Sequence, residues 1–357
     1  MKVTRLSAVT LDVPLFKPFG ISGGAQVTAN QVLVTVELEG GAKGRGEAAP
    51  FPAFNGETQA MALEAVERSR RVVEGEDARR LRPLAAAIRG TAQGSASARC
   101  AIETALVDAV GRAARLPAWA FFGGAEARLE SDVTIPTGSV EEARSETIAW
   151  RSKGFRRFKV KVGGAGAKDD LARLVAIHEA SAGGELMLDG NAGLTASDAL
   201  DLLSSLRARG ITPILFEQPT AAHDLGALAE VTKRGGVPVC ADESCGSAAD
   251  VMAIARLGAA SSVNVKLMKS GVVEALAIVE AAKAAGLGLM IGGMVEARLA
   301  MGMSACFAAG LGGFSYVDLD TPLFLAEDPF EGGYEQAGPR LDVSRIEAGH
   351  GVQPKIK

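Results

Sequence analysis

The stretch "RRFKVKVG", residues 156–163, combines the apolar pattern of a buried strand with two lysines. Its apolar residues alternate with Lys159 and Lys161, so the two-residue period of a strand sends both ammonium groups from the same face. Two cations on one face of an otherwise apolar strand raise the question of what that face is built to hold.

Similar short apolar runs alternate with helix-length amphipathic segments from about residue 131 onward. The residues that close the runs from Lys161 to Asp318 follow one another at intervals of 24 to 28 positions, which fits one strand, one helix and two loops. Eight such runs are the number that a β/α barrel needs. They are DVTIP (132–136), FKVKV (158–162), LMLDG (186–190), PILFEQP (213–219), VPVCADES (237–244), VNVKL (263–267), LGLMIGG (287–293) and SYVDLD (315–320).

An open, doubly wound sheet is the alternative with the same alternation. Such a sheet usually carries a glycine-rich phosphate-binding turn after its first strand, and the sequence has none there. The pattern therefore favours the barrel.

The first 125 residues have a different pattern, with strand and helix signals in separate blocks. Two stretches rich in Gly and Pro, 18–25 and 49–56, are the kind of loop that can act as a lid. We predict an N-terminal α+β domain at 1–125, a barrel at 126–325 and a tail at 326–357 that folds back onto the N-terminal domain. The N-terminal strand patterns are 2–10 and 31–38, and the helix patterns are 58–74, 78–88 and 96–114.

Composition describes an ordinary globular protein of 357 residues, 48% hydrophobic and 22% charged, with a net charge of -4. No basic block suggests a nucleic-acid partner, and no apolar run approaches the roughly 18 residues of a membrane span. The four cysteines lack metal-ligand spacing and are expected to be reduced and mostly buried. The N-terminus has no signal-peptide pattern, so we expect a cytoplasmic protein.

Three acids close consecutive predicted strands, namely Asp189, Glu217 and Asp242. The carboxyl ends of barrel strands meet at one mouth, where the three carboxylates would repel one another unless a cation compensates them. Oxygen ligands without His or Cys favour Mg²⁺ over zinc. The alternative is that each acid is only a turn residue or a helix cap.

The lysines stand on opposite sides of this mouth. Lys159 and Lys161 belong to the second predicted strand, and Lys266 ends the sixth, almost diametrically across an eight-stranded barrel. One side could remove the proton next to a metal-bound carboxylate and the other could return it, while Mg²⁺ stabilises the enediolate. A nearby cation or second ammonium should lower a lysine pKa and leave a neutral amine as base. A salt-bridged lysine pair is the alternative.

These residues resemble the enolase superfamily, in its muconate-lactonizing subgroup, over nearly the full length. The resemblance implies a modified TIM barrel, (β/α)7β, with an N-terminal α+β capping domain. It also implies Mg²⁺ ligands at Asp189, Glu217 and Asp242, an acid/base pair of Lys161 and Lys266, and a carboxylate-holding role for Lys159. The motifs that carry it are KVK (159–161), DGN (189–191), FEQP (216–219), DES (242–244) and NVK (264–266).

The histidines narrow the choice within the superfamily. His178 and His223 lie in helix patterns and His350 lies in the tail, so all three are expected at the surface. None closes the seventh predicted strand, which excludes the histidine base of mandelate-racemase-like chemistry.

The last predicted strand runs into YVDLDTPLFL, residues 316–325, with Asp318 and Asp320 two positions apart on one face. Two carboxylates at the mouth can hold an ammonium group by charge-assisted hydrogen bonds, although a turn or a salt bridge would also suit them. The pair resembles the signature with which dipeptide epimerases bind a free α-amino group. By the same resemblance Thr134, Met294 and Glu296 would line the dipeptide pocket.

The lid segment departs from one branch of this family. Relatives that act on Ala-Glu resemble one another in carrying a lid arginine, and PFGISGGA, residues 18–25, has none. Gly23 and Gly24 leave space instead, so we expect a substrate with an apolar, uncharged second residue. Arg298 is the residue that could bring a positive charge into the site and overturn this expectation.

The expected function is a Mg²⁺-dependent dipeptide epimerase that inverts the α-carbon of the C-terminal residue. Alternatives on the same scaffold are o-succinylbenzoate synthase, N-acylamino acid racemase and muconate cycloisomerase, whose substrates lack a free ammonium. An aldolase that uses Lys266 as a Schiff-base nucleophile is a second class, and a non-catalytic peptide binder is a third. The expected partner is a small molecule. Barrels of this type are often homo-oligomers, but no residues identify an interface.

Overall fold

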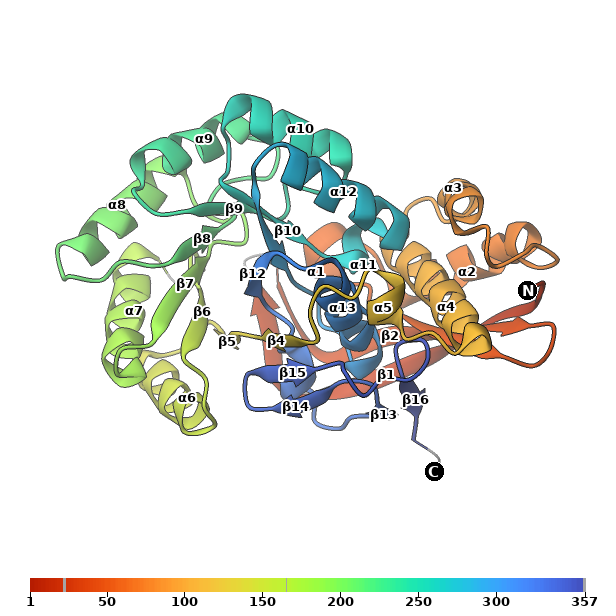
Figure 1. The fold of residues 1–357 in the computed structure, drawn as a ribbon. Helices are drawn as coiled ribbons and strands as arrows, with labels where there is room; N and C mark the ends of the chain where they lie inside the picture. The colour runs from red at the N-terminus through yellow and green to blue at the C-terminus, as the bar shows by residue number, and fades with distance from the viewer. Residues whose placement is uncertain (22–23, 165, 356–357) are drawn as a thin grey trace.

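A computed structural model describes residues 1–21, 24–164 and 166–355 of the chain. Two main sheets organise these residues, a three-stranded antiparallel sheet near the N-terminus and an eight-stranded parallel sheet ringed by helices (Figure 1). In the part of the chain that is described, no helix is long and apolar enough to cross a bilayer.

The parallel sheet forms the predicted (β/α)7β barrel, and its strands follow one another in chain order from β5 to β12. Each of the first seven strands leads into helix on the outside, and β12 has no barrel helix after it. The strands are β5 (Val133–Ile135), β6 (Arg157–Lys161), β7 (Glu185–Asp189), β8 (Leu215–Glu217), β9 (Val239–Ala241), β10 (Ser262–Val265), β11 (Gly288–Ile291) and β12 (Phe314–Val317). The helices are α6 (Val140–Ser152), α7 (Ala167–Ser181), α8 (Ala196–Arg207), α9 (Leu225–Arg234), α10 (Ala248–Leu257), α11 (Leu267–Ser270), α12 (Val272–Ala284) and α13 (Arg298–Leu311).

The two edge strands of this sheet are joined where the chain enters β5. The backbone N–H of Asp132 donates to the carbonyl of Val317 at 2.8 Å. The N–H of Leu319 donates to Oγ of Ser131 at 2.9 Å. These bonds hold the start of β5 beside the end of β12, which matters for the acidic groups described below.

The N-terminal part has the α+β composition that the sequence predicts. Its strands are β1 (Val3–Ile21), β2 (Gly24–Leu38) and β3 (Lys43–Ala48), and its helices are α1 (Pro52–Asn55), α2 (Gln59–Val73), α3 (Leu81–Thr91), α4 (Ala96–Ala114) and α5 (Ala118–Phe121). The β1–β2 hairpin is longer than expected, because pairing resumes between Phe19 and Gln26 after a register shift that follows Pro14. Much of the predicted loop at 18–25 is therefore strand, and Gly23 lies outside the described residues.

Close packing of β3 on α4 explains two glycines. A Cβ atom on Gly44 would lie 2.1 Å from the carbonyl oxygen of Ala105, and one on Gly46 would lie 1.9 Å from that of Ala101. Only a residue without a side chain lets the strand approach the helix backbone this closely.

Two buried carboxylates of the N-terminal part bind the amino ends of barrel helices. Glu47 of β3 accepts N–H groups from Ala297 at 2.7 Å and Ala300 at 3.1 Å, at the start of α13. Glu103 of α4 accepts the N–H of Val273 in α12 at 2.8 Å. The first turn of a helix presents unpaired N–H groups and partial positive charge, so these contacts fasten the N-terminal sheet and α4 to the barrel.

The tail after β12 adds short antiparallel pairs. A 3₁₀ turn (Thr321–Phe324) leads to β13 (Phe330–Gly332), which pairs with β16 (Val352–Pro354). β14 (Glu335–Ala337) and β15 (Arg340–Asp342) form a small sheet with β4 (Arg128–Glu130). We propose 1–125 as the N-terminal domain, 126–325 as the barrel and 326–357 as the tail.

The expected surface position of His350 is wrong, whereas His223 is exposed as expected. His350 has no exposed surface, because the tail brings it against α4, where its backbone N–H donates to Asp108 at 3.0 Å. Its ring Nε2 lies 3.0 Å from the carbonyl oxygen of Arg45. His223 lies in a turn before α9 rather than in a helix. All four cysteines are buried free thiols, as expected.

Candidate active site

A narrow cavity lies at the carboxyl ends of the barrel strands, under the loop that carries α1. It collects residues from the two predicted lysine strands and from the acidic segment after β12. Its lining consists of Phe51, Phe54, Thr134, Lys159, Lys161, Asn191, Lys266, Gly293, Met294, Asp318, Asp320 and Thr321.

The three predicted metal ligands end neighbouring strands, as expected. Asp189 and Glu217 are the last residues of β7 and β8, and Asp242 directly follows β9. None of the three has exposed surface. Register places two of them side by side, because Asp189 pairs with Glu217 across the β7–β8 ladder.

Lysine ammonium groups lie on all three of these carboxylates. Lys161 Nζ is 2.6 Å from Asp189 Oδ2, and Lys266 Nζ is 2.6 Å from Asp242 Oδ2. Lys159 Nζ lies 3.3 Å from Glu217 Oε2, and it also contacts Asp318. Lys161 ends β6 and Lys266 directly follows β10, four places away in the eight-stranded order, so the two lysines line the cavity from opposite sides.

The sequence predicts a lowered lysine pKa for the KVK segment (159–161) beside a metal, and the charge balance at Lys266 acts in the opposite direction. Burial alone would lower the pKa of this lysine, but Asp242 and Glu217 outweigh burial, and the pKa is raised. The expectation counted a metal and a second ammonium but not a carboxylate in direct contact with the amine. Opposite charge at this distance favours the protonated form.

The donor chemistry at Asp189, Glu217 and Asp242 fits a hard divalent cation. Burial and the neighbouring carboxylate of Asp189 raise the pKa of Glu217 to about 7, so the lysines compensate the acids incompletely. Oxygen donors without sulfur or imidazole suit Mg²⁺. Within residues 1–21, 24–164 and 166–355, however, the acids whose ligand atoms lie within 4.8 Å of one another are Asp132, Asp318 and Asp320. The predicted ligand set is therefore kept as a proposal.

The predicted ammonium-binding pair lines the cavity. Asp320 Oδ2 accepts the backbone N–H of Thr134 at 2.6 Å, which fixes that carboxylate. The Oδ1 atoms of both Asp318 and Asp320 are buried without a hydrogen-bond partner. Two unpaired carboxylate oxygens beside a cavity are suited to a cationic donor from a ligand.

The pocket residues inferred from resemblance divide into two groups. Thr134 and Met294 line the cavity, but Glu296 does not. The Glu296 carboxylate accepts the N–H of Met294 at 2.7 Å, so it shapes the loop rather than facing a ligand. Its own N–H donates to Thr321 Oγ1 at 3.2 Å.

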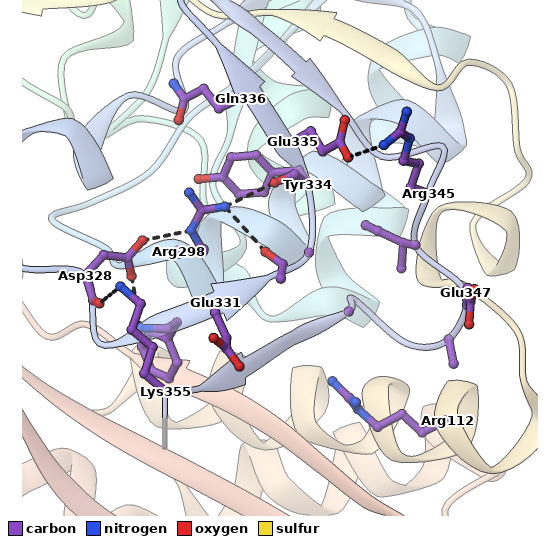
Figure 2. A pocket seen from close by; sticks show the side chains of 16 residues that line it. Arg112, Arg298, Asp328, Glu331, Tyr334, Glu335, Gln336, Arg345, Glu347 and Lys355 are labelled. Carbon is purple, nitrogen blue, oxygen red and sulfur yellow. Dashed lines mark hydrogen bonds and ion pairs between the residues drawn. The ribbon is translucent and has the colours of Figure 1, made fainter. Parts of the chain in front are cut away.

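Arg298 is not among the residues that line the cavity, and it lies in a surface groove of the tail (Figure 2). Its Nε lies 2.8 Å from Asp328 Oδ2, and it donates to the carbonyl of Tyr334 at 3.1 Å. Its guanidinium also lies over the Tyr334 ring, 4.8 Å from the centroid. Held by Asp328 and Tyr334, Arg298 does not bring a positive charge to the cavity.

Sequence reasoning missed several residues that hold the acids in place. Lys269 Nζ lies 2.6 Å from Asp242 Oδ1, and Asn264 donates to Glu217 Oε1 at 2.6 Å. The strand period could have found Asn264, which is two positions before Lys266. Gln218 has φ of 27°, in the left-handed region, and its side chain accepts the N–H of Asp242 at 2.9 Å. These contacts join the ends of β8, β9 and β10.

The fold and the site together define a class of enzyme. Its members have a (β/α)7β barrel in which buried acids lie between opposed lysines, and such lysines can remove or add a proton at the carbon next to a carboxylate. The family model "Enolase C-terminal domain-like" matches residues 141–357. The model "Mandelate racemase / muconate lactonizing enzyme, N-terminal domain" matches residues 5–123. The chain therefore belongs to the mandelate racemase/muconate lactonizing enzyme family of the enolase superfamily.

Individual relatives cover nearly the whole chain. An aromatic dipeptide epimerase from Herpetosiphon aurantiacus is 47% identical, with 98% of each chain covered. An L-Ala-D/L-Glu epimerase from Thermotoga maritima is 36% identical over 96% of this chain and 99% of its own. A solved dipeptide epimerase from Enterococcus faecalis, complexed with Mg and L-Leu-L-Tyr, is 30% identical with a TM-score of 0.94, covering 99% of this chain and 100% of its own. The chain is an enzyme of the isomerase class.

Proposed function

We propose that this protein is a Mg²⁺-dependent dipeptide epimerase that inverts the α-carbon of the C-terminal residue of L,L-dipeptides. The observation that carries the proposal is one cavity lined by opposed Lys161 and Lys266 and by the unpaired carboxylate oxygens of Asp318 and Asp320. Two relatives are named as epimerases of dipeptides, and these names support the same substrate class.

The ammonium end of the dipeptide would bind to Asp318 and Asp320. Their free Oδ1 atoms accept N–H bonds, and the N–H of Thr134 keeps the Asp320 carboxylate in place. Lys159 contacts Asp318, but a substrate with a neutral N-acyl group would leave the buried Oδ1 atoms of Asp318 and Asp320 without a charged donor, which is costly in a buried site. This end of the cavity therefore favours a free amino group over an acyl group.

The carboxylate end would lie among the lysines. Lys159 reaches both Glu217 and Asp318, so its ammonium can bind a substrate carboxylate between the two acidic groups. Asp189, Glu217 and Asp242 would hold the Mg²⁺. When bound, the ion supplies positive charge to the carboxylate oxygens as negative charge develops there.

One lysine removes a proton from the α-carbon and the other lysine delivers a different proton to it. The neutral amine of one lysine takes the α-hydrogen as a proton, and the electron pair of the broken C–H bond spreads into the carboxylate as an enediolate. The other lysine, as an ammonium, donates a proton to the opposite face of the carbon. The configuration inverts, one lysine ends protonated and the other neutral, and exchange with solvent restores the starting state.

The side chain of the second residue would meet an apolar wall. Phe51 and Phe54, from the loop around α1, line the cavity together with Met294. Arg298 is held by Asp328 in the tail groove and does not supply a counterion for a glutamate side chain. We therefore propose a preference for hydrophobic or uncharged second residues over Glu.

The direct test is incubation of an L,L-dipeptide library with protein and Mg²⁺ in D₂O, followed by mass spectrometry of each peptide. We expect one deuterium at the α-carbon of the second residue, with the fastest exchange for apolar side chains. Exchange of N-acylated amino acids without exchange of any dipeptide would contradict the proposal. Activity that survives chelation, together with a covalent enzyme–substrate adduct after borohydride reduction, would instead indicate a Schiff base on Lys266.

A further inference from the structure

Asn264 of β10 carries a buried side-chain amide whose hydrogen bond goes to a predicted metal ligand. Its Nδ2 donates to Glu217 Oε1 at 2.6 Å, and Glu217 ends β8, on the other side of β9 in the sheet. Asn264 has no exposed surface, and among the described residues its Oδ1 has no hydrogen-bond partner. An unpaired buried oxygen costs free energy, so an apolar side chain would suit this place better if packing were its only role.

Gly292 leaves the space that this amide occupies. It directly follows β11, and a Cβ atom on it would lie 2.8 Å from both Nδ2 and Oδ1 of Asn264. Carbon packs against other heavy atoms at roughly 3.5 Å or more, so the amide would have to move. The backbone is held in place, because the Gly292 N–H donates to the carbonyl of Val265 at 3.1 Å. Gly292 does not have the positive φ that usually requires glycine, so the amide is the reason for the missing side chain.

A neutral donor suits a residue that is to bind a metal. Asp189 and Asp242 are held by lysine ammonium groups, whose charge opposes a cation at the same acid. The amide of Asn264 fixes Oε1 of Glu217 without adding positive charge, while Lys159 lies 3.3 Å from the other oxygen. Outer contacts of this kind orient a ligand and help to set the affinity for the ion.

We propose that Asn264 and Gly292 act together as positioning residues for Glu217, so that the glycine makes room for the amide and the amide fixes the carboxylate for Mg²⁺. The inference rests on the proposed function and deepens it. It also gives a reason why β11, the seventh barrel strand, is followed by a residue without a side chain. A larger residue at position 292 would push the amide of Asn264 away from Glu217.

Titration calorimetry of Mg²⁺ into the chelator-treated protein tests the pair through a double-mutant cycle. Gly292→Ala should weaken Mg²⁺ binding roughly 10-fold or more, because its methyl group displaces the amide. Asn264→Ala, which removes the amide, should weaken binding to a similar degree. The double variant should bind Mg²⁺ within about twofold of Asn264→Ala, since the added methyl group then has no amide to displace.

A control on the same strand and a further variant keep the cycle interpretable. Gly288→Ala, at the other end of β11, places a methyl group 3.2 Å from the Cβ of Ser262 and should leave the Mg²⁺ affinity unchanged. Asn264→Leu keeps most of the side-chain volume and lacks the donor, so it should reproduce the weaker binding even if Asn264→Ala proves too unstable to study. Melting temperatures without Mg²⁺ separate the two roles, because a purely structural role would lower the melting temperature and leave the affinity as it is.

Two results would overturn the inference. One is a Mg²⁺ affinity in Asn264→Leu equal to that of the natural protein, which would mean that the amide does not position Glu217. The other is a double variant weaker than Asn264→Ala by the full factor of Gly292→Ala, which would mean that the glycine acts independently of Asn264. If the natural protein binds no Mg²⁺ at all, the proposed function fails instead, so the two failures are distinguishable.

Discussion

Lys159 connects two groups of acids: the predicted metal ligands Asp189, Glu217 and Asp242, and the acids beside Asp318 after β12. Its ammonium lies 3.3 Å from Glu217, 3.4 Å from Asp189 and in contact with Asp318. Burial would lower its pKa, but the surrounding acids raise it well above the usual value, so it is a fixed cation. A substrate carrying both a carboxylate and an ammonium can exchange with these contacts without leaving a buried charge unpaired.

Lys269 has a supporting role that mutation can isolate. It binds Asp242 Oδ1 and the Asp242 carbonyl, both at 2.6 Å, and leaves Oδ2 toward Lys266. Because such outer contacts orient metal ligands, Lys269→Met should weaken Mg²⁺ binding about 10- to 100-fold by titration calorimetry. Lys233→Met, at the surface end of α9, is the control. Equal Mg²⁺ affinity in Lys269→Met and the natural protein would contradict this role.

The sequence pattern predicted the positions of residues at the ends of strands. It could not predict positions that depend on contacts between segments far apart in the sequence. Asp189, Glu217, Lys161 and Lys266 follow from the repeat of the strands. The burial of His350 and the position of Arg298 depend on how the tail packs, which no local period records. The raised pKa of Lys266 likewise depends on Asp242, which belongs to another strand.

Among the elements, β3 and α4 join the N-terminal part to the barrel. The barrel could be predicted because each unit repeats the same strand and helix pattern. The strand patterns 2–10 and 31–38 also fall on β1 and β2, whereas the end of the hairpin near its turn was predicted as a loop. Near the turn, Pro18 and Gly20 in β1 and Gly24 in β2 have the composition of a loop, yet pairing extends both strands there. Local propensity was overridden there by tertiary pairing.

Glu47 of β3, which binds the amino end of α13, should make the stability of the protein depend on pH. Burial raises its pKa to about 7, although the N–H groups of Ala297 and Ala300 act in the opposite direction. The unfolded carboxyl titrates near 4.5, so between that pH and 7 the folded state holds more protons and stability falls as pH rises. Glu47→Gln cannot titrate, and should flatten the curve of unfolding free energy against pH by up to about 3 kcal/mol.

Chemical denaturation at several pH values measures this effect. Glu64→Gln is the control, because Glu64 is largely exposed on α2, where it pairs with Arg68. Its curve should run parallel to that of the natural protein. A Glu47→Gln curve that is also parallel would show that Glu47 is ionised throughout this range in the folded state.

At the scale of the whole molecule, Mg²⁺ could bind at either of two groups of acids: the predicted ligands Asp189, Glu217 and Asp242, or the cluster of Asp132, Asp318 and Asp320. Mg²⁺ that binds only the folded protein should raise its stability, by about 2.7 kcal/mol at a hundredfold excess over Kd. We expect this gain, measured as a shift in melting temperature after chelation and readdition, to disappear in Asp242→Asn and to remain in Asp132→Asn. The reverse pattern would place the ion in the cluster of Asp132, Asp318 and Asp320.

The central claim is that Lys161 and Lys266 act on opposite faces of one carbon. It is tested most directly by NMR of α-hydrogen exchange in D₂O, with Lys161→Ala and Lys266→Ala each given the L,L and the L,D dipeptide. We predict that each variant loses interconversion by at least about 100-fold, yet still exchanges the α-hydrogen of one epimer, and that the two variants exchange opposite epimers. Exchange of the same epimer by both variants would contradict the account.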